Sequence, residues 1–336
     1  MPAIDVPQTD LPQIHLPTAG RPHVVIEPGR KGALRNLDPA LIEALYRQHG
    51  ALLLRGFAAD VAQFRDFART YCATAVVNES PGRDAIDPAN RIYGVNGGTG
   101  AFALHPELSR EPWKPDVAMF CCLSPPSSGG ATTIADGINL VHALPDDVRG
   151  GLAPRRLVYV NGASPQQLQY WLGTAAPDDA LLRAPPASCP YRFARVADGR
   201  IVRHFSRPAL HKPMFADGPA FGNFLLFARF NNGRHDFPLF DDLTPVPEAW
   251  LQAIRVAGEA VQCEVAWREG DVLMLDNTRF LHGRTAIYDA AERRIATFFG
   301  YLRFAGPDPE DPANPVWRRE DFVPPLPPGH PGLQAA

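Results

Sequence analysis

A histidine and a glutamate stand two positions apart in the segment Phe102-Ala-Leu-His105-Pro-Glu107. Because the side chains of a β-strand alternate between its two faces, residues i and i+2 point the same way and can share one metal ion. The pair alone is weak evidence, since 10 histidines and 36 acidic residues in 336 positions would produce such a pair by chance. A second histidine that could bind a metal, His282, follows the dipeptide Asp276-Asn277 much later in the chain.

Two histidines and one carboxylate form a recurring ligand set for iron. In the facial triad of non-haem Fe(II) oxygenases they occupy one face of the metal and leave its other positions open to small molecules. The sequence therefore predicts a metal site formed by His105, Glu107 and His282, with Asp276 as a candidate for orienting a ligand histidine. Each histidine taken singly can equally be a core residue with ordinary hydrogen bonds. Pro106 lacks an N–H, so its strand must be an edge strand or contain a bulge.

Many short apolar runs broken by Gly, Pro and Asn surround these motifs and predict strands. The predicted strands are 51–57, 117–123, 132–135, 157–161, 224–230, 261–267, 272–275 and 294–302. The predicted helices are 39–49, after the N-cap Asp38 and before the stop signal Gly50, together with 60–71, 164–172 and 247–258. Many strands, few helices and no βαβ rhythm predict a mainly β fold with helices (α+β), namely a double-stranded β-helix, or jelly roll, decorated with helices.

Proline-rich ends flank this region. We expect a Pro-rich N-terminal arm at 1–22, a single jelly-roll domain at 23–305 and a Pro-rich C-terminal tail at 306–336. Tails of this kind could pack across a homodimer.

Composition limits the function classes. A net charge of −3 gives no basic footprint, so we expect neither nucleic acid nor an anionic membrane as a partner. No apolar run approaches the length of a membrane helix, and the first residues lack the pattern of a signal peptide. The five cysteines form no framework, which favours free thiols and a cytoplasmic location.

Taken in order, the motifs resemble the taurine dioxygenase superfamily of Fe(II)/2-oxoglutarate oxygenases. Within it, they are similar to the branch with clavaminate synthase, asparagine oxygenase and the syringomycin-pathway hydroxylases. The matching segments are His49–Phe57, His105-Pro-Glu107-Leu-Ser109, Val117–Leu123, Gly129-Gly-Ala-Thr132, Ala135-Asp136, Asp276-Asn277, His282-Gly-Arg284 and Arg293-Arg-Ile295.

The resemblance implies Fe(II), 2-oxoglutarate and O2 as cofactor and co-substrates. It implies that Arg293, eleven positions after His282, binds the far carboxylate of 2-oxoglutarate with help from the Thr132 hydroxyl. Arg294 is the alternative, because a loop change of one residue would exchange the two arginines. Related halogenases have Gly or Ala in place of the acid, so the presence of Glu107 disfavours halogenation.

The resemblance further implies hydroxylation of an unactivated C–H bond in an amino-acid-like small molecule, free or tethered to a carrier protein. Succinate and CO2 would be released, and the pathway would be specialised-metabolite (antibiotic) biosynthesis. Arg83, Arg110, Arg234 and Arg284 are candidate clamps for an anionic group of that substrate, although each could instead belong to a structural ion pair. Two alternatives stay open: desaturation or cyclisation at the same iron, and a non-oxygenase cupin-like metal hydrolase, isomerase or binding protein.

Overall fold

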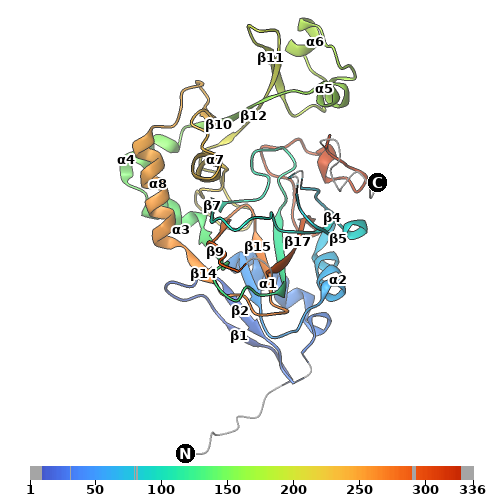
Figure 1. Ribbon diagram of the computed structural model, residues 1–336, viewed down its shortest axis with the longest axis vertical. Helices are drawn as coiled ribbons and strands as arrows, with labels where there is room; N and C mark the ends of the chain where they lie inside the picture. The colour runs from blue at the N-terminus through green and yellow to red at the C-terminus, as the bar shows by residue number, and fades with distance from the viewer. Residues whose placement is uncertain (1–9, 31, 79, 81, 290–292, 327–336) are drawn as a thin grey trace, which may run out of the picture.

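A large β-sheet forms the centre of the molecule (Figure 1). The computed structural model describes residues 10–326 except 31, 79, 81 and 290–292. Among these residues the large sheet has the order β1-β2-β3-β15-β8-β17-β6-β5, with β4 also paired to β17. Its strands are β1 (Gln13–His15), β2 (Val24–Glu27), β3 (Ala51–Leu54), β4 (Cys72–Ala75), β5 (Ala85–Asp87), β6 (Ile92–Gly94), β8 (Val117–Ser124), β15 (Val272–Asp276) and β17 (Arg294–Leu302).

A smaller sheet faces it, with the order β14-β9-β16-β7. Its strands are β7 (Phe102–His105), β9 (Thr132–Asp136), β14 (Cys263–Val265) and β16 (Phe280–Arg284). Along the chain, β7 lies in the small sheet, β8 in the large one, β9 and β14 in the small one, β15 in the large one, β16 in the small one and β17 in the large one. The chain therefore crosses repeatedly between two layers, which brings residues far apart in sequence to one interior.

Strand β8 shows why the strands of the large sheet have continuous apolar sequences. Ala118, Phe120 and Cys122 belong to the core between the two sheets, whereas Val117, Met119 and Cys121 pack beneath helices on the other face. Both faces of the large sheet are thus buried, so its strands lose the apolar–polar alternation of a half-exposed sheet.

Two N-terminal helices, α1 (Pro39–His49) and α2 (Val61–Tyr71), cover that other face. The predicted caps are confirmed. The Asp38 side chain accepts a hydrogen bond from the Ala40 N–H (3.0 Å), and Gly50 ends α1 at φ 72°. In α2 the Asp60 side chain accepts from the Gln63 N–H (2.8 Å), and the Gln63 side chain accepts in return from the Asp60 N–H (3.1 Å).

The segment between β9 and β14 is a long insertion. Its sheet has the order β11-β12-β10-β13 and, with α5 and α6, projects from the upper part of the molecule (Figure 1), while α3 and α8 lie beside the small sheet and α4 lies beside α8. Its elements are α3 (Gly137–Ala143), α4 (Asp146–Leu152), β10 (Arg156–Gly162), α5 (Pro165–Leu172), α6 (Asp179–Arg183), β11 (Arg192–Arg195), β12 (Ile201–Pro208), α7 (Leu225–Phe230), β13 (Leu239–Phe240) and α8 (Glu248–Val261).

The strand predicted at 224–230 was wrong, because Leu225–Phe230 form helix α7. An apolar run of this length fits either element when periodicity is the only guide. The missed signal is Asn223, whose Oδ1 accepts a hydrogen bond from the Leu225 N–H (3.0 Å) and so favours the first turn of a helix.

Both Pro-rich ends contact the body. The segment predicted as the N-terminal arm contains β1, which pairs with β2. In the predicted C-terminal tail Trp317 and Leu326 are buried, and Arg318 pairs with Asp116 at 2.6 Å. Short 3-10 helices lie at Leu34–Asn36, Pro88–Asn90 and Val316–Arg318.

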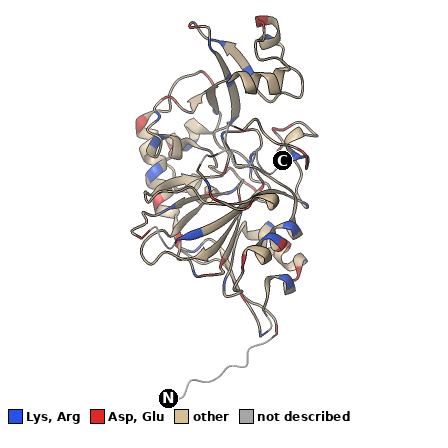
Figure 2. Ribbon diagram, turned by 45° about the vertical axis from the view of Figure 1, so that its right-hand side comes forward, with Lys and Arg blue, Asp and Glu red and all other residues tan. Residues whose placement is uncertain are grey.

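Acidic and basic residues are interspersed along the chain (Figure 2). Within the described residues, no helix combines the length and the apolar character that crossing a bilayer requires.

Replacing Asp60 by Ala removes the capping box of α2. We expect the free energy of unfolding to fall by about 1 kcal/mol, because the Gln63 N–H loses its acceptor. Chemical denaturation measures the change. Asp66→Ala, which removes an exposed carboxylate from the same helix, is the control and should change stability by less than about 0.5 kcal/mol. Equal effects of the two substitutions would contradict the capping role.

Candidate metal centre

His105, Glu107 and His282 converge in the structure. One ligand atom from each lies within 4.8 Å of the other two, and both Glu107 and His282 are buried. The two histidines are direct cross-strand partners on β7 and β16, with ring centroids 4.6 Å apart. Register between two adjacent strands therefore sets the distance between the imidazoles.

Glu107 is placed by a turn rather than by the strand itself. Strand β7, the edge strand of the small sheet, ends at His105, so Pro106 lies just beyond the strand and not within it as expected. The Asn277 side chain then fixes the backbone of Glu107: its Oδ1 accepts from the Glu107 N–H (2.8 Å) and its Nδ2 donates to the Glu107 carbonyl (3.0 Å). Asn277 also donates to the Pro115 carbonyl (2.9 Å), so it ties the turn to the start of β8.

The hydrogen bonds of the imidazoles define which nitrogens are available. His105 Nδ1 lies 2.8 Å from the Ala103 carbonyl, to which it can donate only in the tautomer that leaves Nε2 as a lone-pair donor. His282 Nε2 lies 3.4 Å from Glu107 Oε1, and its buried Nδ1 has no hydrogen-bond partner among the described residues. Asp276 does not orient either ring, contrary to the expectation, because its carboxylate accepts from the N–H and hydroxyl of Thr278 (2.8 and 2.6 Å).

The carboxylate of Glu107 receives two further hydrogen bonds. Asn78 Nδ2 donates to Oε2 (2.7 Å), and the Arg83 guanidinium donates to Oε1 (3.4 Å). Burial alone would raise the pKa of Glu107, but Arg83 and the hydrogen bond from His282 outweigh burial and hold the pKa below its usual range. Burial, followed by the neighbouring His282, lowers the pKa of His105 to about 3.

These protonation states suit a divalent metal. At neutral pH the site offers an ionised carboxylate and a neutral imidazole, which are the forms that bind metal ions. A polar nitrogen left without a partner in a buried site, as in His282, is uncommon in proteins. The donor set of two nitrogens and one oxygen is that of the iron facial triad. The residues present therefore fit an Fe(II) ion.

Aromatic rings surround the imidazoles. Phe120 lies 5.0 Å from the His282 ring, and Phe227 and Phe224 lie 4.4 and 6.3 Å from the His105 ring. Such a wall limits the access of water to the two rings.

A second polar group lies along β9 and the start of β17. Arg293 Nε donates to the Gly130 carbonyl (3.0 Å), and a side chain at Gly130 would meet the Arg293 side chain at 3.0 Å. Burial, with the nearby Arg284, lowers the pKa of Arg293 to about 10. Thr132 is buried, and its hydroxyl accepts from Trp267 Nε1 (2.9 Å). Arg294, in contrast, is exposed.

The four arginines proposed to contact substrate fall in different environments. Arg83 is buried and reaches Glu107, as described, while its Nε donates to Asn96 Oδ1 (3.0 Å). Arg110 lies over the Phe224 ring at 5.0 Å. Arg284 donates to backbone carbonyls of Asn96, Gly98 and Gly100 at 2.7–3.2 Å, so it holds the 96–100 loop. Arg234 lies over the Phe237 ring (4.4 Å) with Nε 3.4 Å from Asp236.

Asn78 is the contact that the sequence did not reveal. It stands in an irregular segment without a motif, and only the folded chain brings it to Glu107. Its position directly after two buried valines, Val76 and Val77, is a weak indication in the sequence that the Asn78 side chain lies in the interior.

Comparisons with known proteins agree with this geometry. Residues 20–298 match the family described as taurine catabolism dioxygenase TauD, TfdA family. No curated protein matches the chain. Among solved structures, it is similar to PvcB from Pseudomonas aeruginosa, with 18% identity, a TM-score of 0.57 and coverage of 91% of this chain and 95% of that one.

A second PvcB structure, described as an Fe, alpha-ketoglutarate dependent oxygenase from an isonitrile synthetic pathway, has 18% identity, a TM-score of 0.56 and coverage of 91% and 96%. A taurine dioxygenase from Burkholderia xenovorans has 16% identity, a TM-score of 0.57 and coverage of 88% and 91%. At these identities the solved structures establish the fold, whereas the family match extends over most of the chain. The chain thus belongs to the TauD/TfdA family and is a 2-oxoglutarate-dependent oxygenase that uses Fe(II) and O2.

Proposed function

We propose that His105, Glu107 and His282 hold the Fe(II) ion and that the enzyme hydroxylates an unactivated C–H bond of an amino-acid-like small molecule, free or tethered to a carrier protein. The observation that carries the proposal is the convergence of three ligand atoms within 4.8 Å, two from histidines on paired strands and one from the turn that follows β7. When bound, iron and 2-oxoglutarate supply the oxidising chemistry, with release of succinate and CO2. The protein residues position the ligands and exclude water.

Arg293 and Thr132 are the proposed contacts of the far carboxylate of 2-oxoglutarate. Among the described residues, no acidic side chain lies within ion-pairing distance of Arg293 or of the neighbouring Arg284, which leaves buried positive charge for an anionic ligand to neutralise. Arg293 is partly buried and binds the Gly130 carbonyl, two residues before Thr132 at the start of β9, whereas Arg294 is exposed. These contacts favour Arg293 over Arg294.

Arg83 and Arg110 are the proposed contacts of an anionic substrate group. Arg83 reaches Glu107, and Arg110 lies over Phe224 beside His105, so both guanidinium groups border the metal centre. A guanidinium binds a carboxylate through two parallel hydrogen bonds, which suits an amino acid. The contacts of Arg234 and Arg284 support a structural role for each instead.

The branch with asparagine oxygenase and the syringomycin-pathway hydroxylases, and a role in specialised metabolism, remain part of this proposal. The motif order supports the branch. The similarity to PvcB, whose structure is described as coming from an isonitrile synthetic pathway, supports the metabolic context by analogy. Membership of the TauD/TfdA family argues against the cupin-like hydrolase, isomerase or binding protein.

The proposed core is a jelly roll built from β6 to β9 and β14 to β17. Four of these strands lie in each sheet, and the chain crosses between the sheets as a jelly roll requires. We propose one domain at 23–305 around this core, with 1–22 and 306–336 as its flanking arm and tail.

Product mass tests the reaction type. Purified enzyme with Fe(II), 2-oxoglutarate and O2 is incubated with a panel of amino acids, each free or attached to a carrier protein, and succinate formation identifies the substrate. Hydroxylation predicts a product heavier by one oxygen atom. A product lighter by two hydrogen atoms would instead establish desaturation or cyclisation. The matching amine without the carboxylate should trigger little succinate, because it cannot pair with Arg83 or Arg110.

Replacing Glu107 by Ala should abolish turnover. The loss of a direct ligand should weaken Fe(II) binding by at least about 100-fold, since even losing an outer-shell partner costs about 10- to 100-fold. Fe(II) affinity and succinate formation are measured together, with Glu269→Ala, an exposed glutamate, as the control. Full turnover in Glu107→Ala would contradict the assignment of Glu107 as a ligand of the iron.

Replacing each of the two adjacent arginines in turn by alanine shows which of them binds 2-oxoglutarate. Arg293→Ala should weaken 2-oxoglutarate binding by about 10- to 100-fold, because a hydrogen-bonded charge pair contributes roughly 1.5–3 kcal/mol. Arg294→Ala should leave the affinity unchanged, since this side chain is exposed. Titration calorimetry of the Fe(II)-loaded protein measures both. The reverse result would assign the co-substrate to Arg294.

A further inference from the structure

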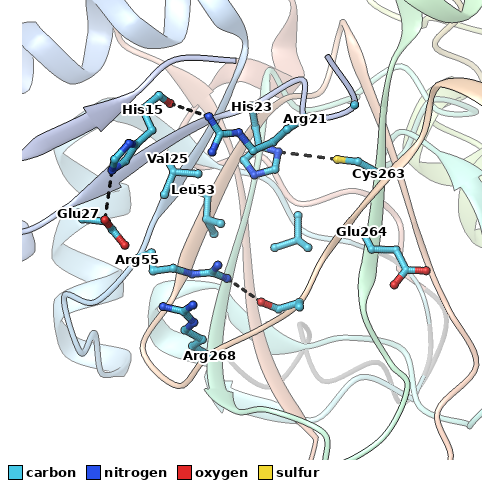
Figure 3. Close-up of a pocket in the computed structure, with 13 residues that line it drawn as sticks. His15, Arg21, His23, Val25, Glu27, Leu53, Arg55, Cys263, Glu264 and Arg268 are labelled. Atoms are coloured by element: carbon cyan, nitrogen blue, oxygen red, sulfur yellow. Dashed lines mark hydrogen bonds and ion pairs between the residues drawn. The ribbon is translucent and has the colours of Figure 1, made fainter. Parts of the chain in front are cut away.

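A second cavity lies away from the metal centre. Its volume is about 450 Å³, and its walls come from β2 and β3 of the large sheet and from β14, the edge strand of the small sheet (Figure 3). We refer to it as the edge cavity, and its polar lining includes Arg21, His23, Arg55, Cys263 and Arg268. Cavities of this size hold small metabolites in other proteins.

The register of the small sheet fixes the position of the edge cavity. Cys263 pairs with Ile134, Ile134 pairs with His282, and His282 pairs with His105, so the four residues form one row across the sheet. With strands about 4.8 Å apart, the Cys263 backbone lies about 10 Å from that of His282. The fully buried Ile134 side chain stands between them. The edge cavity is therefore a separate site on the same sheet.

Two of the three arginines in the edge cavity lack an acidic partner within the part of the chain that the structure describes. Arg55 is neutralised by the buried Asp271 (2.7 Å), and Glu27 pairs with His15 (3.2 Å). Among the described residues, no acidic group lies within ion-pairing distance of Arg21 or Arg268, and the carboxylate of Glu264 is directed away from the guanidinium groups (Figure 3). Arg21, which is partly buried, and Arg268, which is exposed, are therefore the two guanidinium groups of the lining that have no ion-pair partner among the described residues.

Arg21 also has unused hydrogen-bonding capacity. One terminal nitrogen donates to the Leu16 carbonyl (2.6 Å), which holds the side chain in place, while its buried Nε has no partner.

His23 reports the same positive environment. It is 4% exposed, and the one partner of its Nδ1 among the described residues is the Cys263 sulfur, at 3.8 Å. Burial, followed by the charges of Arg21 and Arg55, lowers the pKa of His23 to about 4. The imidazole is thus neutral at physiological pH and adds a hydrogen-bonding group without adding charge.

We propose that the edge cavity binds a small oxyanion, a carboxylate or a phosphate, between Arg21 and Arg268. Guanidinium groups recognise both anions through paired, charge-assisted hydrogen bonds. Arg55 is already paired with Asp271, so it forms part of the cavity wall and its charge is neutralised. The site does not depend on the proposed reaction at iron.

Cys263 provides a reporter for occupancy. It lines the cavity and is partly buried, as is Cys189 elsewhere in the molecule, whereas the other three cysteines are buried. Burial raises the pKa of the Cys263 thiol to about 11, so its reaction with the neutral reagent iodoacetamide is slow and is followed over hours by peptide mass spectrometry. Cys189 is the internal control. The probes are inorganic phosphate and succinate, each compared with chloride at constant ionic strength.

We expect saturable protection of Cys263, by about tenfold at ten times the dissociation constant, and an unchanged rate at Cys189. Arg21→Ala and Arg268→Ala should remove the protection, whereas Arg200→Ala, which changes an exposed arginine, should retain it. Equilibrium dialysis of labelled phosphate measures binding directly. The succinate arm uses the Arg293→Ala background, so that binding near iron is not counted.

Protection by one anion alone would identify the ligand as a phosphate or a carboxylate. Three results would overturn the proposal: no saturable binding of either anion, equal slowing of Cys263 and Cys189, or protection that persists without Arg21 and Arg268. Binding by dialysis without protection of Cys263 would place the anion elsewhere and would also overturn it.

Discussion

The cross-strand pairing of His105 with His282 is the constraint on which the rest of the site depends. Because side chains alternate along a strand, a slip of one residue in this pairing would turn one imidazole out of the interior. The edge position of β7 makes the register vulnerable, since β16 is its one strand neighbour in the described sheet, although the Asn231 side chain also binds the Ala103 N–H (2.7 Å) and the Ala101 carbonyl (3.0 Å). Asn277 compensates by fixing the Glu107 turn from both its N–H and its carbonyl, so that strand and turn present their ligands together.

Charged side chains are removed from solvent at the site. Glu107 is kept ionised inside the protein by Arg83, Asn78 and His282, while Arg293 lies partly buried without an acidic partner among the residues that the structure describes. Unpaired buried charge is costly, so proteins retain it where a ligand completes the pair. A divalent cation beside Glu107 and a dicarboxylate beside Arg293 are complementary to these two charges. The same reasoning, applied to Arg21 and Arg268, points to an anion in the edge cavity.

The sequence predicted those features that depend on local chemistry. The caps at Asp38 and Gly50, the strands of the sheet core and the His105–Glu107 pair are encoded by residue types and spacing within a few positions, whereas His282 was added from its motif and the fold brings it to them. Long-range contacts could not be read in this way. Asn78 reaches Glu107 only through tertiary folding, Arg284 was proposed for substrate but holds a loop, and the apolar segment 225–230 folds as α7 because its periodicity is too short to be decisive.

We propose that His105, Glu107 and His282 hold an iron ion that chelates 2-oxoglutarate. The visible absorption of anaerobic protein, titrated with Fe(II) and then with 2-oxoglutarate, tests this site beside the variant His105→Ala. We expect a charge-transfer band that requires both additions and is lost in the variant. Absence of the band in the metal-loaded protein, or its full retention in His105→Ala, would contradict the assignment of the site.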